Sequence, residues 1–210
     1  TLNVEKTPGG GPMVTREWIA PDATWRYHDD GITPPNDPQG DSWREHDFDD
    51  SEWPSGPAEI GYGDGDEATS VDCGPSRPVC NSGNHMTTWF RSHFTLAPGE
   101  AARTLQLTMD VLRDDGAAVY INGVEVWRDN LPGIVGDNTL TPTTPASSPI
   151  FDNAELVYQP PLVLQSGTYN LSGLLRDGDN VIAVEVHQIN DTSSDLSLKV
   201  RLTARLFLSV

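Results

Sequence analysis

Short runs in which apolar and polar residues alternate recur along this chain, and they predict β-strands. Between residues 104 and 112, Leu105, Leu107 and Met109 share one face. Between residues 196 and 208, every second residue is apolar. Period-2 patterning over many short runs, interrupted by Gly, Pro, Asn and Asp, is typical of an antiparallel β-sandwich. Further strands are predicted over residues 24–28, 58–62, 88–96, 154–158 and 181–187.

The clearest turn signal lies between residues 118–121 and 124–127, two β-rich runs joined by Asn122-Gly123. Asn-Gly favours a two-residue hairpin, because both central positions of a type I′ turn need positive φ. Residues 169–175 predict one helical turn in which the leucines dock together. The fold class predicted is therefore all-β, an antiparallel β-sandwich with at most one or two short helical turns.

Two long polar segments, residues 64–86 and 129–153, separate predicted strands. Loops longer than about 12–15 residues in a compact domain tend to be functional or disordered. Residues 1–13 contain the run TPGGGP and are expected to form a linker or N-terminal extension. Residues 14–210 are expected to form a single domain, since this length suits one large all-β unit.

Acidic residues outnumber basic ones, 31 to 13, which gives a formal net charge of −18. A surface this negative repels phosphate backbones and anionic lipids, so nucleic-acid binding and membrane adsorption are not expected. No apolar run approaches the roughly 18 residues that a membrane span needs. The acidic clusters indicate either solubility in a salty environment or loops that bind Ca²⁺ through carboxylate oxygens.

Cys73 and Cys80 are the only cysteines, and they lie seven residues apart in a polar loop. No further Cys or His pair stands nearby at zinc spacing. A disulfide that closes this loop is the favoured interpretation, and two free thiols are the alternative. A disulfide would place the protein in an oxidising, extracytoplasmic compartment.

Five motifs of this chain, in order, resemble the galactose-binding-domain-like jelly-roll superfamily. Within it, the sugar-binding β-sandwich domains of family 2 glycoside hydrolases and the β-sandwich modules of secreted bacterial hydrolases are the most similar. The motifs span residues 24–205 and are Trp25-x-Tyr27, Trp43 with Phe48–Trp53, Trp89–Phe94, residues 115–126 and residues 178–186.

The resemblance implies a jelly-roll of two opposed antiparallel sheets, a ligand site on loops at one end and, in many relatives, a structural Ca²⁺. It implies no catalysis by the domain itself, and it suggests a bacterial source. The motif aromatics Trp25, Trp43, Trp53 and Phe90 are expected to pack between the two sheets. The two long loops and the cysteine segment depart from the pattern.

Sugar binding requires flat aromatic faces for the CH-rich side of a pyranose, with polar groups around them for its hydroxyls. Trp127 is the first candidate platform because it ends a strand beside the second long loop; ordinary hairpin packing is the alternative. His187 begins a polar stretch that either bonds hydroxyls or caps its own turn. The residues predicted to bind ligand are Trp127, Arg128, Asn130, Tyr158, His187, Gln188 and Asn190.

Three acidic clusters compete as calcium sites. Asp64, Asp66 and Glu67 resemble the start of a calcium loop, but the twelfth position is Pro75, so this is no EF-hand. Asp29 and Asp30, near Asp37 and Asp41, form the second cluster. The third, Asp47, Asp49 and Asp50, has turn capping as its alternative.

No compact catalytic motif is present: the five histidines form neither HxH nor HExxH, and GxSxG is absent. Abundant carboxylates could supply a glycosidase dyad, but they are more simply solvated. The favoured hypothesis is a secreted, non-catalytic carbohydrate-binding module that tethers a larger enzyme to polysaccharide and contacts adjacent domains of its own chain. The alternatives are a structural or protein-interaction domain without a glycan site and, last, a small hydrolase or lyase.

Overall fold

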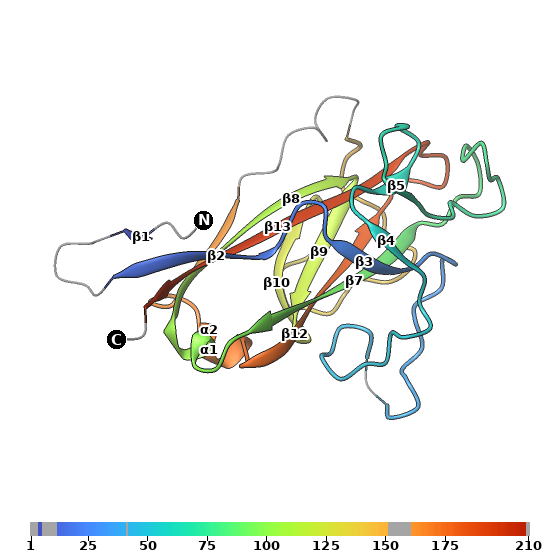
Figure 1. Ribbon diagram of the computed structural model, residues 1–210. Helices are drawn as coiled ribbons and strands as arrows, with labels where there is room; N and C mark the ends of the chain where they lie inside the picture. The colour runs from blue at the N-terminus through green and yellow to red at the C-terminus, as the bar shows by residue number, and fades with distance from the viewer. Residues whose placement is uncertain (1–3, 6–11, 41, 151–160, 209–210) are drawn as a thin grey trace.

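The structure is a computed structural model, and it describes all residues except 1–3, 6–11, 41, 151–160 and 209–210. Two β-sheets face each other across an apolar core (Figure 1). The predicted antiparallel β-sandwich is confirmed. One parallel pair, β5 with β6, occurs among the described strands.

The seven-stranded sheet is built around β13, its longest strand. β8 pairs along one side of β13 and is followed by β11; on the other side, β5 pairs with the first part of β13 and β2 with the last part. β1 and β6 extend the two outer ends. The strands are β1 (Val4–Glu5), β2 (Met13–Ile19), β5 (Ile60–Tyr62), β6 (Thr69–Ser70), β8 (Thr104–Asp114), β11 (Leu162–Gln165) and β13 (Leu196–Phe207).

The six-stranded sheet runs in the order β10-β9-β12-β7-β3-β4. Its central strand β12 pairs with β7 on one side and β9 on the other. The strands are β3 (Thr24–His28), β4 (Ser55–Pro57), β7 (Thr87–Leu96), β9 (Gly116–Ile121), β10 (Val124–Asp129) and β12 (Gly178–His187). Two helical turns, α1 (Glu100–Arg103) and α2 (Leu171–Leu174), lie at one end of the sandwich, and the loops around β5 and β6 lie at the other (Figure 1).

Alternating residues from both sheets form the main core. The apolar positions of β13 from Leu196 to Leu206 are all buried there, as the period-2 pattern predicts. Trp25 and Phe90 are fully buried in the same core, which confirms their expected place between the sheets. The hairpin is confirmed too, with φ of 48° at Asn122 and 87° at Gly123.

A second apolar cluster covers the outer face of the six-stranded sheet. Trp43 and Phe48, from the segment between β3 and β4, pack there against Trp89 and Tyr120. Trp53 packs on this cluster and stays partly exposed. The expectation that Trp43 and Trp53 lie between the sheets is therefore wrong. The sequence pattern records that these aromatics are apolar, but a loop residue has no strand alternation that tells which face it covers.

The expectation that Leu105 shares the inward face with Leu107 and Met109 is also wrong. Arg205 pairs with Gln106, whereas Leu206 pairs with Thr104, so Leu105 is an extra residue in the ladder. Such a β-bulge re-aims a side chain and breaks the alternation. Leu107 and Met109 are buried in the core, while Leu105 is half-exposed on the outer face.

The other short elements follow the expectations. The helical turn predicted over residues 169–175 is confirmed as α2, and its three leucines join the core. Inside the first long loop, β6 is a short strand that was not predicted. The strand predicted at 154–158 lies outside the described residues. Within residues 1–13, β1 pairs with the start of β2, and Met13 is the first residue of that strand.

Candidate functional site

A pocket of about 350 Å³ opens among the loops at the end of the sandwich opposite the helical turns. Three segments wall it: the end of β5, the cysteine loop and the turn between β12 and β13. Its lining combines an aromatic ring, a guanidinium group, two serine hydroxyls and apolar surface, from Tyr62, Gly63, Ser70, Val71, Arg77, Pro78, Val79, Cys80 and Ser194. We refer to it as the end-loop pocket.

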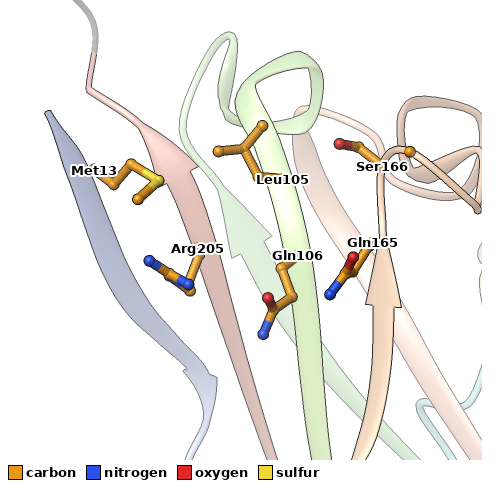
Figure 2. A pocket seen from close by; sticks show the side chains of 7 residues that line it. Met13, Leu105, Gln106, Gln165, Ser166 and Arg205 are labelled. Carbon is orange, nitrogen blue, oxygen red and sulfur yellow. The ribbon is translucent and has the colours of Figure 1, made fainter. Parts of the chain in front are cut away.

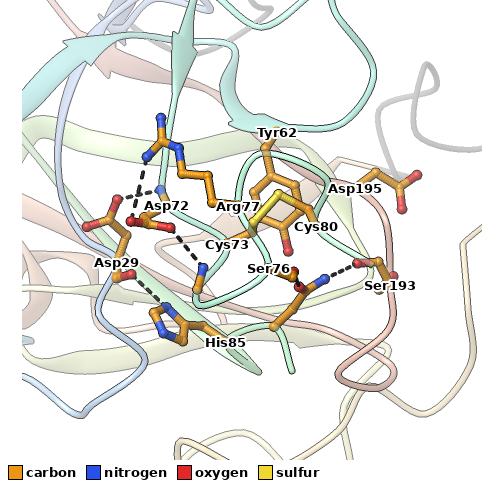
Figure 3. Close-up of a disulfide and its surroundings, with 12 residues drawn as sticks. Asp29, Tyr62, Asp72, Cys73, Ser76, Arg77, Cys80, His85, Ser193 and Asp195 are labelled. Carbon is orange, nitrogen blue, oxygen red and sulfur yellow. Dashed lines mark hydrogen bonds and ion pairs between the residues drawn. A yellow bond between two sulfur atoms is a disulfide. The ribbon is translucent and has the colours of Figure 1, made fainter. Parts of the chain in front are cut away.

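A disulfide shapes one wall of the end-loop pocket. Cys73 and Cys80 are bonded, as predicted, and both are buried (Figure 3). Within the closed loop, Arg77 lies in an ion pair with Asp72, at 3.6 Å between Nη1 and Oδ2. The loop therefore holds this guanidinium group at the rim of the pocket.

Asn84 fastens the cysteine loop to the turn that forms the opposite wall. Its backbone N–H donates to the carbonyl oxygen of Asp191 at 3.0 Å. Its side-chain Nδ2 donates to the carbonyl oxygen of Ser193 at 2.6 Å, and its Oδ1 accepts from the Ser76 hydroxyl at 2.6 Å (Figure 3). Because Asn84 is buried, loss of these bonds would leave polar groups unpaired.

The back of the pocket is set by Tyr62 and Gln188. The Gln188 amide donates through Nε2 to the Tyr62 hydroxyl oxygen at 2.9 Å and to the Asp195 carbonyl oxygen at 2.6 Å. Burial raises the pKa of Tyr62 far above its ordinary value, so the hydroxyl stays protonated at all physiological pH. Tyr62 accepts a hydrogen bond from Gln188 and keeps its own proton to donate.

Gln188 is thus the predicted ligand residue that the structure brings closest to the pocket, where it supports Tyr62 from behind. The neighbouring His187 is fully buried and points elsewhere: its Nδ1 lies 2.8 Å from the Thr144 carbonyl oxygen. Asn190 caps its own turn by accepting from the backbone N–H and the hydroxyl of Thr192 at 2.8 and 2.6 Å.

The predicted residues on β10 do not line the end-loop pocket. Trp127 is partly buried and packs on the main core. The Arg128 guanidinium is almost fully buried and pairs with Glu125 at 2.7 Å. Asn130 donates to the carbonyl oxygens of Asp115 and Ser148. Tyr158 lies outside the described residues. Sugar binding by these residues stays a prediction.

The lining residues that sequence reasoning missed are Tyr62, Ser70, Arg77 and Ser194. Tyr62 stands at the end of a short buried strand, and the pattern assigned it to the core. The available signal was the cysteine loop itself, since a disulfide in a long polar loop fixes whatever side chains it carries. The partner wall, more than a hundred residues away in sequence, left no local signal.

Polar side chains on the outer face of the six-stranded sheet form a buried network instead of an open site. The Tyr120 hydroxyl donates to Glu185 at 2.6 Å, and Arg44 pairs with the same carboxylate at 3.4 Å. Burial raises the pKa of Glu185, but His187 and Arg44 outweigh burial and hold that pKa below its ordinary value. The carboxylate therefore stays ionised and ties the covering loop to the sheet.

The acidic residues predicted to bind Ca²⁺ make other contacts in this structure. Both Glu67 oxygens accept backbone N–H groups, from Asp64 at 2.9 Å and Gly65 at 3.0 Å. Asp29 accepts from the backbone of Asp72 at 2.6 Å, and Asp30 from that of Ile32 at 2.8 Å. No cluster of three or more His, Cys, Asp or Glu in the described part of the chain is placed to coordinate a metal ion.

Asp64 nevertheless shows how closely the first acidic cluster is packed. Burial, followed by the charges of Asp195, Glu67 and Asp66, raises the pKa of Asp64 to about 6. The Ser197 hydroxyl donates to its Oδ2 at 3.2 Å. The calcium prediction is neither supported nor opposed by this arrangement, and it stays a prediction.

No protein-family model and no curated protein sequence matches this chain. Among solved structures it is similar to the Bacteroides uniformis β-glucuronidase 2, with 17% identity and a TM-score of 0.52 over 90% of this chain and 18% of that one. It is also similar to the Ruminococcus gnavus β-glucuronidase, with 12% identity and a TM-score of 0.49 over 91% of this chain and 28% of that one. A β-glucuronidase from glycoside hydrolase family 2 gives 16% identity and 0.47 over 95% and 18%.

At these identities the likeness shows the shared β-sandwich fold. The chain spans about a fifth of the length of the first of these enzymes, 18%. Neither helical turn in the described residues has the length or the apolar character of a membrane-crossing helix.

Proposed function

We propose that this chain is a non-catalytic glycan-binding domain of a larger carbohydrate-active protein, and that it holds a saccharide unit in the end-loop pocket. The observation that carries the proposal is the composition of that pocket. Tyr62 offers a ring face and a hydroxyl donor, Arg77 a guanidinium fork, and Ser70 and Ser194 hydroxyl groups. A volume of about 350 Å³ falls within the range of small-molecule sites, about 300–1,000 Å³.

The fold likeness supports an accessory role. A domain with this fold makes up 18% of the length of the β-glucuronidase 2 chain, so a unit of this kind can work beside a catalytic domain. We infer that the present chain contacts adjacent domains in the same way and tethers or orients them on polysaccharide. This inference rests on analogy of fold, which by itself does not fix function.

The pocket also favours binding over catalysis. Glycoside hydrolysis in most families uses two carboxyl groups that flank the scissile bond. The lining of the end-loop pocket includes neither a carboxylate nor a histidine. Asp64 and Asp195 lie on neighbouring segments, but neither lines the pocket.

The disulfide supports a secreted location. Disulfides persist in oxidising compartments and are rare in the cytosol, and Cys73–Cys80 forms part of the pocket wall. We infer that the domain acts outside the cytoplasm, and a bacterial source fits the organisms of the similar structures.

The test is a glycan-array screen with the oxidised chain, followed by calorimetric titration of Arg77→Ala against the best ligand. We expect affinity to fall roughly tenfold or more, because a charge-assisted hydrogen bond contributes about 1.5–3 kcal/mol. Arg176→Ala is the matched control, since both side chains are 51% exposed and each makes one long ion pair. Equal losses in the two variants would refute binding in the end-loop pocket.

Trp127→Ala separates this site from the one that the sequence favours. If Trp127 is the sugar platform, its removal weakens binding by roughly 1–3 kcal/mol, as for other interface aromatics. If the end-loop pocket is the site, the affinity of Trp127→Ala stays within twofold of the parent, since Trp127 is not among the lining residues.

A structural or protein-interaction domain is the second candidate. The observation that favours it is that Arg128, His187 and Gln188 are internal and spend their polar groups on the fold. An array without any retained glycan, together with co-purification of a neighbouring domain, would favour this second function.

A further inference from the structure

We propose that the outer face of the seven-stranded sheet carries a second binding site, which takes a saccharide bearing a carboxylate group. The site is the groove of about 240 Å³ where β2, β13, β8 and β11 lie side by side (Figure 2). Its lining is Met13, Leu105, Gln106, Gln165, Ser166, Gly167 and Arg205. It is separate from the end-loop pocket and does not depend on glycan binding there.

The strand register places three polar side chains in one row. Arg205 of β13 pairs with Gln106 of β8, and Gln106 pairs with Gln165 of β11. Neighbouring strands lie about 4.8 Å apart, so the row extends about 10 Å across the sheet. Figure 2 shows the three side chains on the same face of their strands. This spacing matches a ligand with several polar groups along one edge.

The β-bulge in β8 gives the groove its apolar side. Because Leu105 is the extra residue at the bulge, its side chain stands on the outer face beside Gln106 (Figure 2). The Ser166 backbone N–H donates to the Leu105 carbonyl oxygen at 2.8 Å, which fixes the bulge to the end of β11. Met13 lines the opposite side. Bulges of this kind are over-represented next to functional sites.

The row has the groups that an acidic sugar needs. A guanidinium group binds a carboxylate through two parallel hydrogen bonds. Each glutamine amide offers both a donor and an acceptor, which suits sugar hydroxyls. The Gln106 Nε2 donates to the Thr108 hydroxyl at 2.9 Å, which orients that amide and leaves its oxygen to accept. The Leu105 and Met13 side chains cover the CH-rich side of the ring.

The charge pattern selects for the carboxylate. Arg205 is the one ionised side chain in the described lining of the groove, on a chain of net charge −18. Anions are repelled at long range by such a surface, so an acidic ligand is retained only where a direct guanidinium contact replaces that repulsion. Two rows from the groove floor, Arg201 is engaged by Asp110 at 2.6 Å and is not part of the lining.

The probe is trigalacturonate, compared with its methyl ester, in calorimetric titrations at about 0.15 M salt, where exposed charges beyond about 8 Å are screened. We expect the acid to bind and the ester, which has the same shape without the charge, to bind at least tenfold more weakly. Equal affinity for acid and ester would overturn the proposal, as would no detectable binding of the acid.

Arg205→Gln should weaken trigalacturonate binding at least tenfold, and Arg201→Gln should leave it within twofold. Arg201 is the matched control because it lies on the same strand and the same face. If Arg205→Gln fails to fold, Gln106→Ala and Gln165→Ala keep the test open, since both should weaken binding without removing a charge. Equal effects of Arg205→Gln and Arg201→Gln would show charge attraction without a site.

Arg77→Ala must leave trigalacturonate binding unchanged. Loss of the array ligand with retention of trigalacturonate would support both sites separately. A parallel loss of trigalacturonate in Arg77→Ala would move the acidic ligand to the end-loop pocket and overturn the second site.

Discussion

At the scale of single residues, Arg91 does most to attach the covering loop to the six-stranded sheet. Its side chain is fully buried, and it donates to the Asp50 carboxylate at 2.7 Å, to the Glu45 carbonyl oxygen at 3.0 Å and to the Trp43 carbonyl oxygen. A planar guanidinium group can satisfy several acceptors at once, which an ammonium group cannot do in the same geometry. One arginine therefore positions the loop that carries Trp43 and Phe48.

The carboxylate of Asp50 makes this attachment sensitive to pH. Burial raises the pKa of Asp50, but hydrogen bonds from His93 and Arg91 outweigh burial and lower that pKa to about 2. The same bond to Asp50, opposed by burial and aided by Asp179, raises the pKa of His93 above 6.5. The Asp50 contribution is present above pH 3.8, and the His93 contribution is present below pH 6.5.

We therefore expect the stabilisation by this pair to be greatest between about pH 4 and pH 6.5 and to be lost as pH rises through the pKa of His93. In His93→Gln the decline in unfolding free energy on the alkaline side should shrink by less than about 1 kcal/mol, because His93 is partly exposed and screened by solvent. Denaturant titrations of parent and variant at pH 5.5 and 8.5 measure it. Parallel pH profiles would contradict the role of His93.

At the scale of elements, irregular features create both proposed sites. The disulfide loop walls the end-loop pocket, and the bulge in β8 turns Leu105 into the second groove. Regular strands of the same composition would close over the core and leave flat faces. The sandwich supplies rigid support, and the departures from regularity supply concave surface.

We expect the double variant Cys73→Ser/Cys80→Ser to lose about 2 kcal/mol of unfolding free energy, since cross-linking a short loop restricts the unfolded chain by roughly this amount. Glycan affinity in the end-loop pocket should fall as well, because the cysteine loop carries Arg77. Trigalacturonate binding in the groove should be kept. Unchanged affinity for the array ligand in this variant would show that the loop is not a binding wall.

At the scale of the whole molecule, the charge of −18 is concentrated in loops and works against the compact state through self-repulsion. Asp64 is the clearest example. A carboxyl group whose pKa rises on folding destabilises the fold as pH increases, here from 3.8 to about 6. Above that window the cluster around Asp64 is charged and a bound cation would stabilise it.

The calcium prediction is tested by thermal unfolding at pH 7.5 after chelation, with added Ca²⁺ or Mg²⁺. If a site of the extracellular type forms, with a Kd of about 10⁻⁴–10⁻³ M, about 10 mM Ca²⁺ adds roughly 1.4–2.7 kcal/mol. The melting temperature should then rise by about 3–6 °C. Equal curves in Ca²⁺, Mg²⁺ and chelator would end the calcium prediction.

The strands were predictable wherever one face is buried, because alternation is then written along the chain. This holds for β13 and for the Asn122-Gly123 hairpin, whose turn needs only local conformational preferences. It fails at Leu105, where one inserted residue changes the face of a side chain. It fails again at Trp43, because a loop can bury an aromatic against either side of a sheet.

The candidate sites were less predictable because each is assembled from distant segments. Gln188 was chosen for its position at the end of a strand, but its partner is the hydroxyl of Tyr62, 126 residues away. Arg77 was not chosen, although it lies in the loop that the two cysteines marked. Polar residues near strand ends are numerous, and sequence alone does not tell which ones face a cavity.

By itself, the sequence determined that this protein is an antiparallel β-sandwich with a closed cysteine loop and an acidic surface. These properties depend on alternation, local turn preference, residue spacing and composition, all of which are local or additive along the chain. Only the tertiary structure decided which side chains meet in the end-loop pocket and in the groove at the β8 bulge. Those meetings depend on strand register and loop path, and both are fixed by packing between segments that are far apart in sequence.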